Sequence, residues 1–355
     1  MFALLAMALS IGGVLVATIA VDVLLHQRAD KYASVNVWGY RGATVGRKKP
    51  GEHRIVVVGG STAFGYGVTT ADAFPARLEA VLRPLAKQGA PLTVVNLGMN
   101  GQGAYAMKVD LEDYEYLDYD AVVLYEGYND VNDYSNVFVM RRESPVYRLI
   151  GYYPIFPVVF EEKAMALRYG GDISAAYGRQ KTVFRPGIAQ RATATALQTA
   201  ADITKSLQRQ LDHLERTPGV RRDNAALKDA AHGCEKRWAH YCTALYDAIR
   251  YSLDRRRKVV VVTQPYLLVL HRDQQLALRG MLALEFPGAP DVKYVNLGPV
   301  FEPIGKDKAL FYDGMHATAE GNRQIARRLA VPLTELMSDV FHPAAATMTT
   351  AAPPR

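Results

Sequence analysis

Cysteine is scarce in this chain, whose 355 residues contain only Cys234 and Cys242. On one continuous helix the two side chains would be turned about 80° apart and separated by about 12 Å. That separation is too large for a disulfide unless the helix breaks between them. We therefore expect two unpaired thiols, with a bridge as the alternative in an oxidising compartment. His232 and His240 share this stretch, but no carboxylate or thiol arrangement completes a zinc signature, so no metal site is predicted.

Nucleic-acid and nucleotide motifs are also missing, although the net charge is +7. The densest basic run, residues 255–258, leads straight into an expected strand and is typical of a solvated helix end. Gly59, Gly65 and Gly67 do not have the dinucleotide-binding spacing, and no Gly-Lys-Ser/Thr of a P-loop follows them. We therefore expect no nucleic-acid partner.

Charged side chains are absent from residues 2–21, and Asp22 interrupts only the end of this apolar run. About 20 apolar residues span a bilayer core as a helix. A cleaved signal peptide has a basic start and a shorter apolar stretch. The sequence therefore predicts a transmembrane anchor over residues 1–26 and a polar linker over residues 27–52. A signal peptide and a buried helix are the alternatives.

The remaining chain alternates between short apolar runs and helical patterns. The runs are rich in β-branched residues and end at glycine or polar residues, as buried strands do. This alternation predicts a parallel sheet covered by helices on both faces. The expected strands are residues 54–59, 92–97, 121–125, 258–263 and 292–297; the expected helices between and after them are residues 72–86, 103–117 and 318–338.

Residues 132–250 break this alternation and are predicted to be an insertion within a domain that covers residues 53–341. The insertion begins with Tyr, Phe and Pro and continues with two helical patterns, at 188–216 and 224–254. It would lie beside the strand ends where ligands bind, as a lid, a substrate wall or a packing element. The tail, residues 342–355, is low in complexity and predicted to be disordered.

Four short motifs each lie in a loop that follows an expected strand, and together they supply the parts of one catalytic site. Ser61 precedes a helix, and its hydroxyl needs a base to become a nucleophile. His316 is a natural base near neutral pH, and Asp313 can accept from its far ring nitrogen. The backbone N–H groups of Ser61 and Gly101 and the side-chain amide of Asn129 can donate to a developing oxyanion.

Each motif also has a purely structural interpretation. Residues 59–62 fit a helix cap or a phosphate cradle, and Ala63 rules out a Gly-x-Ser-x-Gly elbow. Residues 96–103 fit an ordinary strand-to-helix turn, and residues 127–130 fit an Asx-type turn. His316 fits a surface histidine beside a helix cap. The combination, in this order, favours the catalytic interpretation.

The combination resembles the SGNH hydrolases, also called the GDSL-type esterase/lipase family, which is named for a Ser, a Gly, an Asn and a His. Ser61, Gly101, Asn129 and His316 match these blocks in order, and Asp313 matches the acid of the Asp-x-x-His block. The resemblance implies a flavodoxin-like three-layer α/β/α sandwich with a five-stranded parallel sheet of order 2-1-3-4-5.

The resemblance covers residues 53–131 and 258–338 and has one departure. The usual Gly-Asp-Ser-Leu reads Gly-Gly60-Ser61-Thr62, which removes a charge beside the nucleophile and keeps the nucleophile itself.

The resemblance implies a serine hydrolase that acts on a small-molecule, lipid or carbohydrate ester and needs no metal or organic cofactor. Two alternatives remain: an O-acyltransferase that passes the acyl group to a sugar hydroxyl, and a non-catalytic membrane-tethered carbohydrate-binding or assembly protein. The Lys and Arg residues after the apolar run favour a cytoplasmic domain by the positive-inside rule. The resemblance favours an extracytoplasmic one, which we expect.

Overall fold

The structure of the chain is a computed structural model, and it forms two units. The N-terminal unit consists of Met1–Gly39 and Arg141–Gly219, and the sheet unit consists of Tyr40–Met140 and Val220–Arg355. The structure describes residues 2–28, 34–125, 127–131, 139–168, 193, 195–196, 199, 202, 232–235, 237–266, 269–301, 309–312 and 315–343. The predicted helix at 188–216 and, from residue 344 on, the predicted tail fall almost entirely outside these residues.

The sheet unit contains five parallel strands in the order β2-β1-β3-β4-β5, so the predicted order is confirmed. The three central strands are buried almost throughout, as a sheet covered on both faces requires. The strands are β1 (His53–Gly59), β2 (Leu92–Asn96), β3 (Ala121–Tyr125), β4 (Lys258–Thr263) and β5 (Val292–Asn296).

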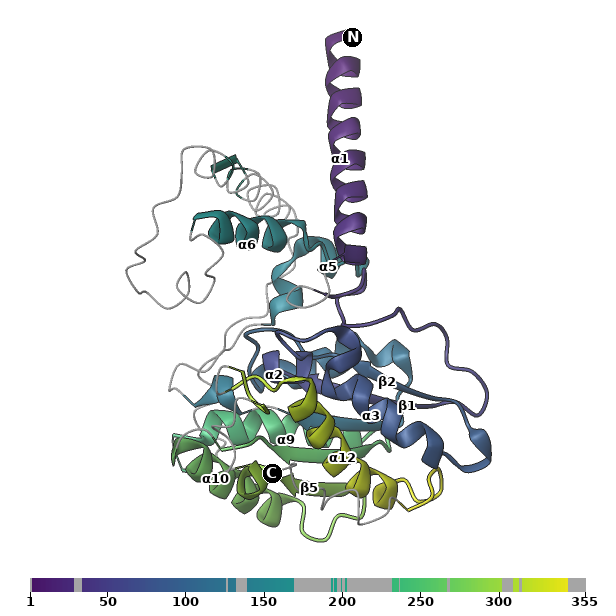
Figure 1. Cartoon of the computed structure of the whole chain (residues 1–355), viewed down its shortest axis with the longest axis vertical. Coiled ribbons are helices and arrows are strands. Elements are labelled where there is room, and N and C mark those ends of the chain that lie inside the picture. Colours follow the sequence, from purple (N-terminus) through teal and green to yellow (C-terminus); the bar gives the residue numbers. More distant parts are fainter. Residues whose placement is uncertain are drawn as a thin grey trace. The chain divides into compact units, whose positions relative to one another are not determined.

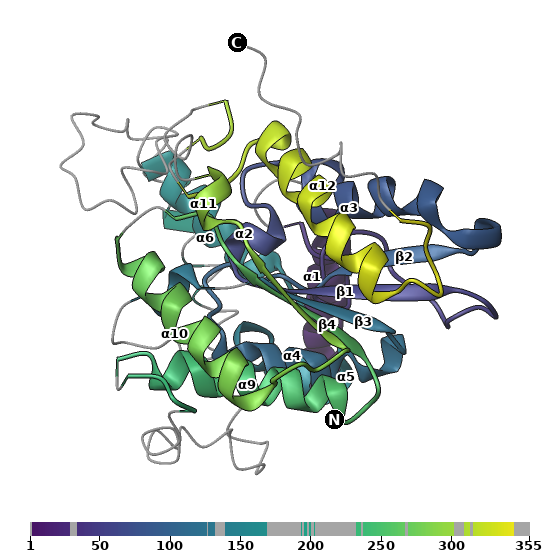
Figure 2. The same ribbon diagram turned by 90° about the horizontal axis from the view of Figure 1, so that it is seen from below.

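Helices cover both faces of this sheet (Figure 2). One face carries α3 (Phe74–Leu82) and α12 (Ala319–Leu336), which pack on each other. The other face carries α4 (Tyr105–Asp113), α9 (Ala239–Leu253) and α10 (Val269–Glu285). The main apolar core lies under α3 and α12, where Val57, Val123 and Val260 meet Leu78 and Leu329. The predicted three-layer class is therefore confirmed.

The N-terminal unit contains α1 (Phe2–Arg28), α5 (Pro145–Ile150) and α6 (Phe156–Arg168) (Figure 1). Asp22, in the later part of α1, is 2% exposed. Its carboxylate accepts the N–H groups of Ile155 and Phe156 at 2.9 and 2.6 Å and lies 3.2 Å from His26 Nε2. This end of α1 is therefore held by polar contacts with protein.

The predicted transmembrane anchor is not supported. The apolar run does form a helix, but none of the helices among the described residues meets the length and hydropathy needed to cross a bilayer. The sequence interpretation rested on the absence of charge over residues 2–21. It gave little weight to Asp22, which the structure places inside the protein.

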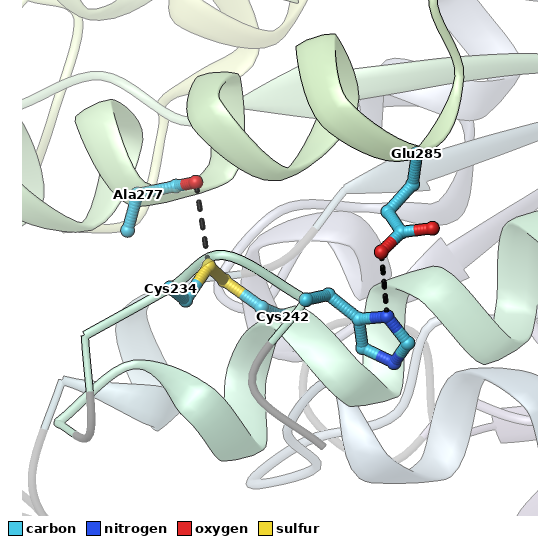
Figure 3. The surroundings of a disulfide bond; sticks show 5 residues. Cys234, Cys242, Ala277 and Glu285 are labelled. Carbon is cyan, nitrogen blue, oxygen red and sulfur yellow. Dashed lines mark hydrogen bonds and ion pairs between the residues drawn. A yellow bond between two sulfur atoms is a disulfide. The ribbon is translucent and has the colours of Figure 1, made fainter.

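The expectation of two unpaired thiols is wrong, because Cys234 and Cys242 form a disulfide (Figure 3). The helix α9 begins at Ala239, so Cys234 lies in the loop before it. The chain bends back there, and the two Cα atoms come within 6.5 Å. The prediction failed because it placed both cysteines on one helix.

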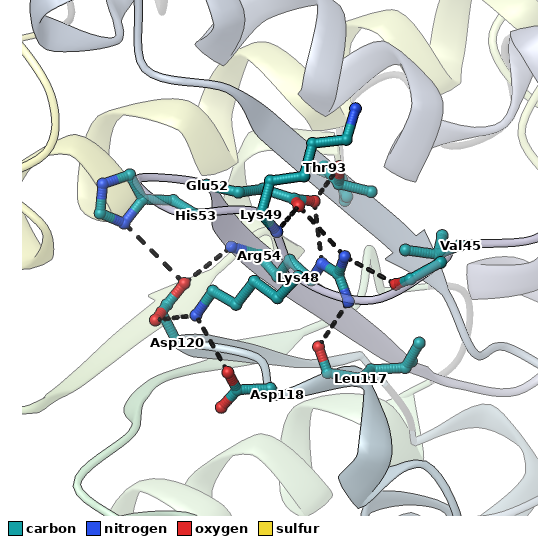
Figure 4. Close-up of polar contacts among 12 residues, drawn as sticks. Val45, Lys48, Lys49, Glu52, His53, Arg54, Thr93, Leu117, Asp118 and Asp120 are labelled. Carbon is teal, nitrogen blue, oxygen red and sulfur yellow. Dashed lines mark hydrogen bonds and ion pairs between the residues drawn. The ribbon is translucent and has the colours of Figure 1, made fainter.

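A buried guanidinium joins the start of β1 to the loops around it (Figure 4). Arg54 is 1% exposed and donates to Glu52 Oε1, Leu117 O and Gly46 O, each at 2.8 Å. Hydrogen bonding from Arg54 lowers the pKa of Glu52 to about 2, and Thr93 adds a further hydrogen bond at 2.8 Å. The pair therefore stays ionised in the folded protein at neutral pH.

Replacing this guanidinium is expected to destabilise the fold strongly. Arg54→Met leaves the Glu52 carboxylate buried without a cation, a change that costs about 3–5 kcal/mol. Urea unfolding at pH 7 measures the loss. Arg250→Met is the matched control, because the Arg250 side chain is 51% exposed and forms an ion pair with Asp254. An exposed pair of this kind contributes at most about 1 kcal/mol. Equal effects of the two variants would contradict this account.

Candidate active site

The described site residues gather at the carboxyl edge of the sheet. Ser61 begins the short helix α2 (Ser61–Phe64) directly after β1, and Gly101 lies in the loop after β2. Asn129 lies in the single 3-10 turn η5 (Tyr128–Asp130) that follows β3. His316 precedes α12, which Thr318 caps through its hydroxyl. Parallel strands end at one edge, so residues from distant parts of the sequence converge there.

The turn that carries Ser61 is fixed by a buried arginine. Arg41, 2% exposed, donates through its guanidinium to Phe64 O, Gly65 O and Val68 O at 2.6, 2.7 and 2.6 Å. Phe64 is the last residue of α2, and the other two residues follow it; a helix end leaves such carbonyls without helical partners. Arg41 therefore satisfies the end of the helix that carries the candidate nucleophile.

Ser61 and His316 lie within hydrogen-bonding distance, with His316 Nε2 2.8 Å from Ser61 Oγ. Both side chains are partly buried. When the imidazole carries its proton on Nδ1, Nε2 accepts the serine hydroxyl, which is the arrangement that base-assisted attack requires.

The backbone around His316 forms a closed loop. The N–H of Tyr312 donates to His316 O at 3.1 Å, and Phe311 and Ala317 form an antiparallel bridge next to it. The imidazole packs between two rings, with centroid distances of 5.0 Å to Tyr66 and 5.8 Å to Tyr312. The aromatic contacts and the backbone pairing restrict the direction in which the imidazole points.

Asp313, the predicted acid, lies outside the described residues. Its role as the partner of His316 therefore stays a prediction.

Two of the three predicted oxyanion donors, Gly101 and Asn129, belong to loops that are bonded to each other. Asn129 Nδ2 donates to the carbonyl of Gln102 at 2.8 Å. A side-chain amide carries two hydrogens, so this bond uses one of them. Gly101, next to Gln102, has φ +73°, a backbone conformation that favours glycine. The contribution of Gly101 and Asn129 to an oxyanion hole stays a prediction.

The loop after β2 also touches the nucleophile turn directly. A Cβ on Gly98 would lie 2.4 Å from Phe64 N, so only glycine permits this approach. Asn96 Nδ2 donates to Phe64 O at 3.1 Å. At Gly98 the backbone of the loop after β2 therefore lies directly against the backbone of the turn after β1.

Asp130 adds a buried carboxyl group to this loop system. Both its oxygens accept the N–H of Ala104, at 3.0 and 3.2 Å, and the residue is 6% exposed. Burial raises the pKa of Asp130 to about 7, although the Ala104 hydrogen bond acts in the opposite direction. Asp130 therefore ties the loop after β3 to the start of α4.

The sequence interpretation missed several residues that shape the site. Arg41 stood in the predicted linker, and Tyr66 and Tyr312 carried no motif. Gln264 could have been found from the sequence, because it follows β4 directly and the predicted site residues lie in the loops after the other strands.

Among the described residues, no group of three or more His, Cys, Asp or Glu side chains could hold a metal ion.

The strand order and the positions of Ser61, Gly101, Asn129 and His316 after the strands agree with the fold that the resemblance implies. No protein-family model and no curated protein matches the chain.

Several solved structures are similar to it, three of which follow. A putative lipolytic protein of the G-D-S-L family from Desulfitobacterium hafniense is 8% identical with a TM-score of 0.40, covering 78% of this chain and 97% of its own. An acetylxylan esterase from Geobacillus stearothermophilus is 14% identical with a TM-score of 0.41, and the match covers 80% of this chain and 94% of the esterase. An alpha/beta hydrolase from the metagenome of Lake Arreo, Spain, is 12% identical with a TM-score of 0.42, and the match covers 80% of this chain and 96% of that hydrolase. Sequence identities and TM-scores this low do not indicate the activity of this chain.

The Asp130 carboxyl is expected to make stability depend on pH. An unfolded aspartate has a pKa of about 3.9, so between pH 4 and 7 the folded chain holds a proton that the unfolded chain has lost. Stability due to this group is thus present below pH 4 and lost as pH rises to 7, by an amount on the order of 4 kcal/mol. Asp130→Asn, which stays neutral, should remove this decline.

Urea unfolding at a series of pH values measures the difference between wild type and Asp130→Asn. Asp254→Asn is the control, since that side chain is 58% exposed. A constant difference across pH 4–8 for Asp130→Asn would show that its carboxyl has an ordinary pKa.

Proposed function

We propose that the chain is a serine ester hydrolase of SGNH type, acting through an acyl-enzyme on a carboxylic ester. The observation that carries this proposal is the 2.8 Å contact between Ser61 Oγ and His316 Nε2. A hydroxyl at the carboxyl edge of a parallel sheet, bonded to an imidazole, is the arrangement of an activated nucleophile.

The proposed reaction begins when His316 Nε2 takes the hydroxyl proton of Ser61. The serine oxygen bonds to the ester carbonyl carbon, and the carbonyl oxygen becomes an oxyanion. The backbone N–H groups of Ser61 and Gly101 and the Asn129 amide donate to it. His316 then gives its proton to the leaving alcohol as the carbon–oxygen bond breaks, leaving an acyl group on Ser61.

Water completes the cycle by the reverse sequence. His316 removes a proton from water, the hydroxide attacks the acyl carbon, and the proton returns to Ser61 Oγ as the acid leaves. Asp313 is assigned to hold the proton on His316 Nδ1 and to stabilise the imidazolium. The substrate class that we propose is an O-acylated carbohydrate, lipid or small molecule.

The disulfide supports an oxidising compartment for the sheet unit. Such bonds persist outside the reducing cytosol, and Cys234 and Cys242 both belong to this unit. We therefore keep the extracytoplasmic location as part of the proposal.

Covalent labelling tests the nucleophile. A fluorophosphonate probe should label the wild-type protein, and Ser61→Ala should lose the label because it lacks the attacking oxygen. Thr69→Ala is the control: Thr69 is a hydroxyl residue in the same region that bonds to Asp72, and its loss should leave labelling intact. Equal labelling of wild type and Ser61→Ala would place the reactive group elsewhere.

Removing the Asn129 amide tests the oxyanion hole. Asn129→Ala should keep the fold and lower kcat about 10²–10³-fold, with little change in KM, because the donor acts in the transition state. Hydrolysis of 4-nitrophenyl acetate measures both constants. Unchanged turnover would exclude Asn129 from the reaction.

A further inference from the structure

Gln264 lies at the catalytic edge without belonging to any of the four motifs. It is the first residue after β4 and is 3% exposed. Val262 of β4 is level with Tyr125 of β3, so Gln264 follows β4 beside the segment that follows β3. A buried amide at this place must find partners among the loops around the site.

Both ends of the Gln264 amide are bonded, each to a different catalytic loop. Its Nε2 donates to Thr62 Oγ1 at 2.5 Å, and its Oε1 accepts the N–H of Tyr128 at 3.2 Å. Thr62 is the residue after Ser61, and Tyr128 is the residue before Asn129. One planar amide therefore spans from the nucleophile turn to the loop of the predicted oxyanion donor.

A second glutamine holds the same peptide group from α10. Gln274 Nε2 donates to Gly127 O at 3.0 Å, and Gln274 is 4% exposed. The carbonyl of Gly127 and the N–H of Tyr128 belong to one peptide bond, so the two glutamines fix both of its polar groups. Tyr128 Oη also donates to Pro265 O. The backbone that leads into Asn129 is thus tied to the β4–α10 segment.

The partner of Gln264 on the nucleophile turn is one of the two residues, with Gly60, at which this chain departs from the usual motif. Where Gly-Asp-Ser-Leu has leucine, this chain has Thr62, whose hydroxyl accepts from the buried amide. A leucine there would leave Gln264 Nε2 buried without this acceptor. The threonine and the glutamine therefore form a matched pair.

We propose that Gln264 is a positioning residue of the hydrolase site, an inference that rests on the proposed function. Its amide sets the distance between the nucleophile turn and the Asn129 loop, so that the Ser61 N–H and the Asn129 amide aim at one oxyanion. Catalytic donors act only when held close to the productive geometry, and a misplacement of about 1 Å can lower the rate about 10²-fold.

The test is a double-mutant cycle with Thr62→Val and Gln264→Met, which remove the hydroxyl and the amide at similar volume. Each should lower kcat for 4-nitrophenyl acetate about 10–100-fold while KM changes less than about 3-fold. The double variant should be no slower than Gln264→Met, because both changes break the same bond. Thr62→Ser, which keeps the hydroxyl, should restore kcat to within about 3-fold of wild type.

Two further measurements separate positioning from folding. Gln324→Met removes another buried glutamine, whose amide bonds to Glu320 on α12, and should leave kcat unchanged. Urea unfolding of every variant reports the effect on stability, and the Thr62 and Gln264 changes should be coupled there too.

Three outcomes would overturn the proposal. If the fold-losses in kcat of the two single variants multiply in the double variant, Thr62 and Gln264 do not act through one bond. Coupling in stability with an unchanged kcat would make the link purely structural. A wild-type protein that neither hydrolyses the ester nor labels with fluorophosphonate would end the proposed function, and the positioning role with it, whatever the unfolding cycle shows.

Discussion

The hydrogen bond between Ser61 and His316 joins residues 255 positions apart, and the rest of the site depends on it. The parallel sheet makes it geometrically accessible, since β1 is a central strand and delivers Ser61 to the carboxyl edge. His316 reaches the same edge because its loop is closed by backbone pairing and followed by α12, which packs on α3. Neither residue could meet the other through local sequence alone.

Around this pair, loops from different strands are bonded into one assembly. Arg41 and Asn96 hold the carbonyls after α2, while Asn129 and Gln102 join the loops after β3 and β2. Gln264 adds the connection from β4. Buried donors in these links satisfy main-chain or side-chain acceptors that would otherwise be costly to bury. These links fix the loops that carry Ser61, Gly101 and Asn129, and fixed donors are the condition for the oxyanion stabilisation that we propose.

Much of the fold follows from local patterns. Runs such as residues 54–59 are β-branched and apolar, and their alternation with helices predicts the covered parallel sheet that the structure has. The strand order was predicted from the family resemblance. Residues in the loops that follow parallel strands converge at one edge of the sheet, which is why Ser61 and His316 could be selected from the sequence. Long-range contacts could not be read in this way. The burial of Arg41 depends on carbonyls more than 20 residues along the chain, and the disulfide depends on α9 beginning at Ala239. Asp22, which follows the apolar run, is held by contacts with residues more than 130 positions away, and the composition of the run does not reveal them.

A crystal structure of the protein inactivated by a fluorophosphonate tests the central claim most directly. The account predicts phosphorus bonded to Ser61 Oγ, the phosphonyl oxygen about 3 Å from Asn129 Nδ2 and the Gly101 N–H, and the imidazole of His316 beside the adduct. Phosphorus on another residue, or a phosphonyl oxygen directed away from both donors, would contradict it.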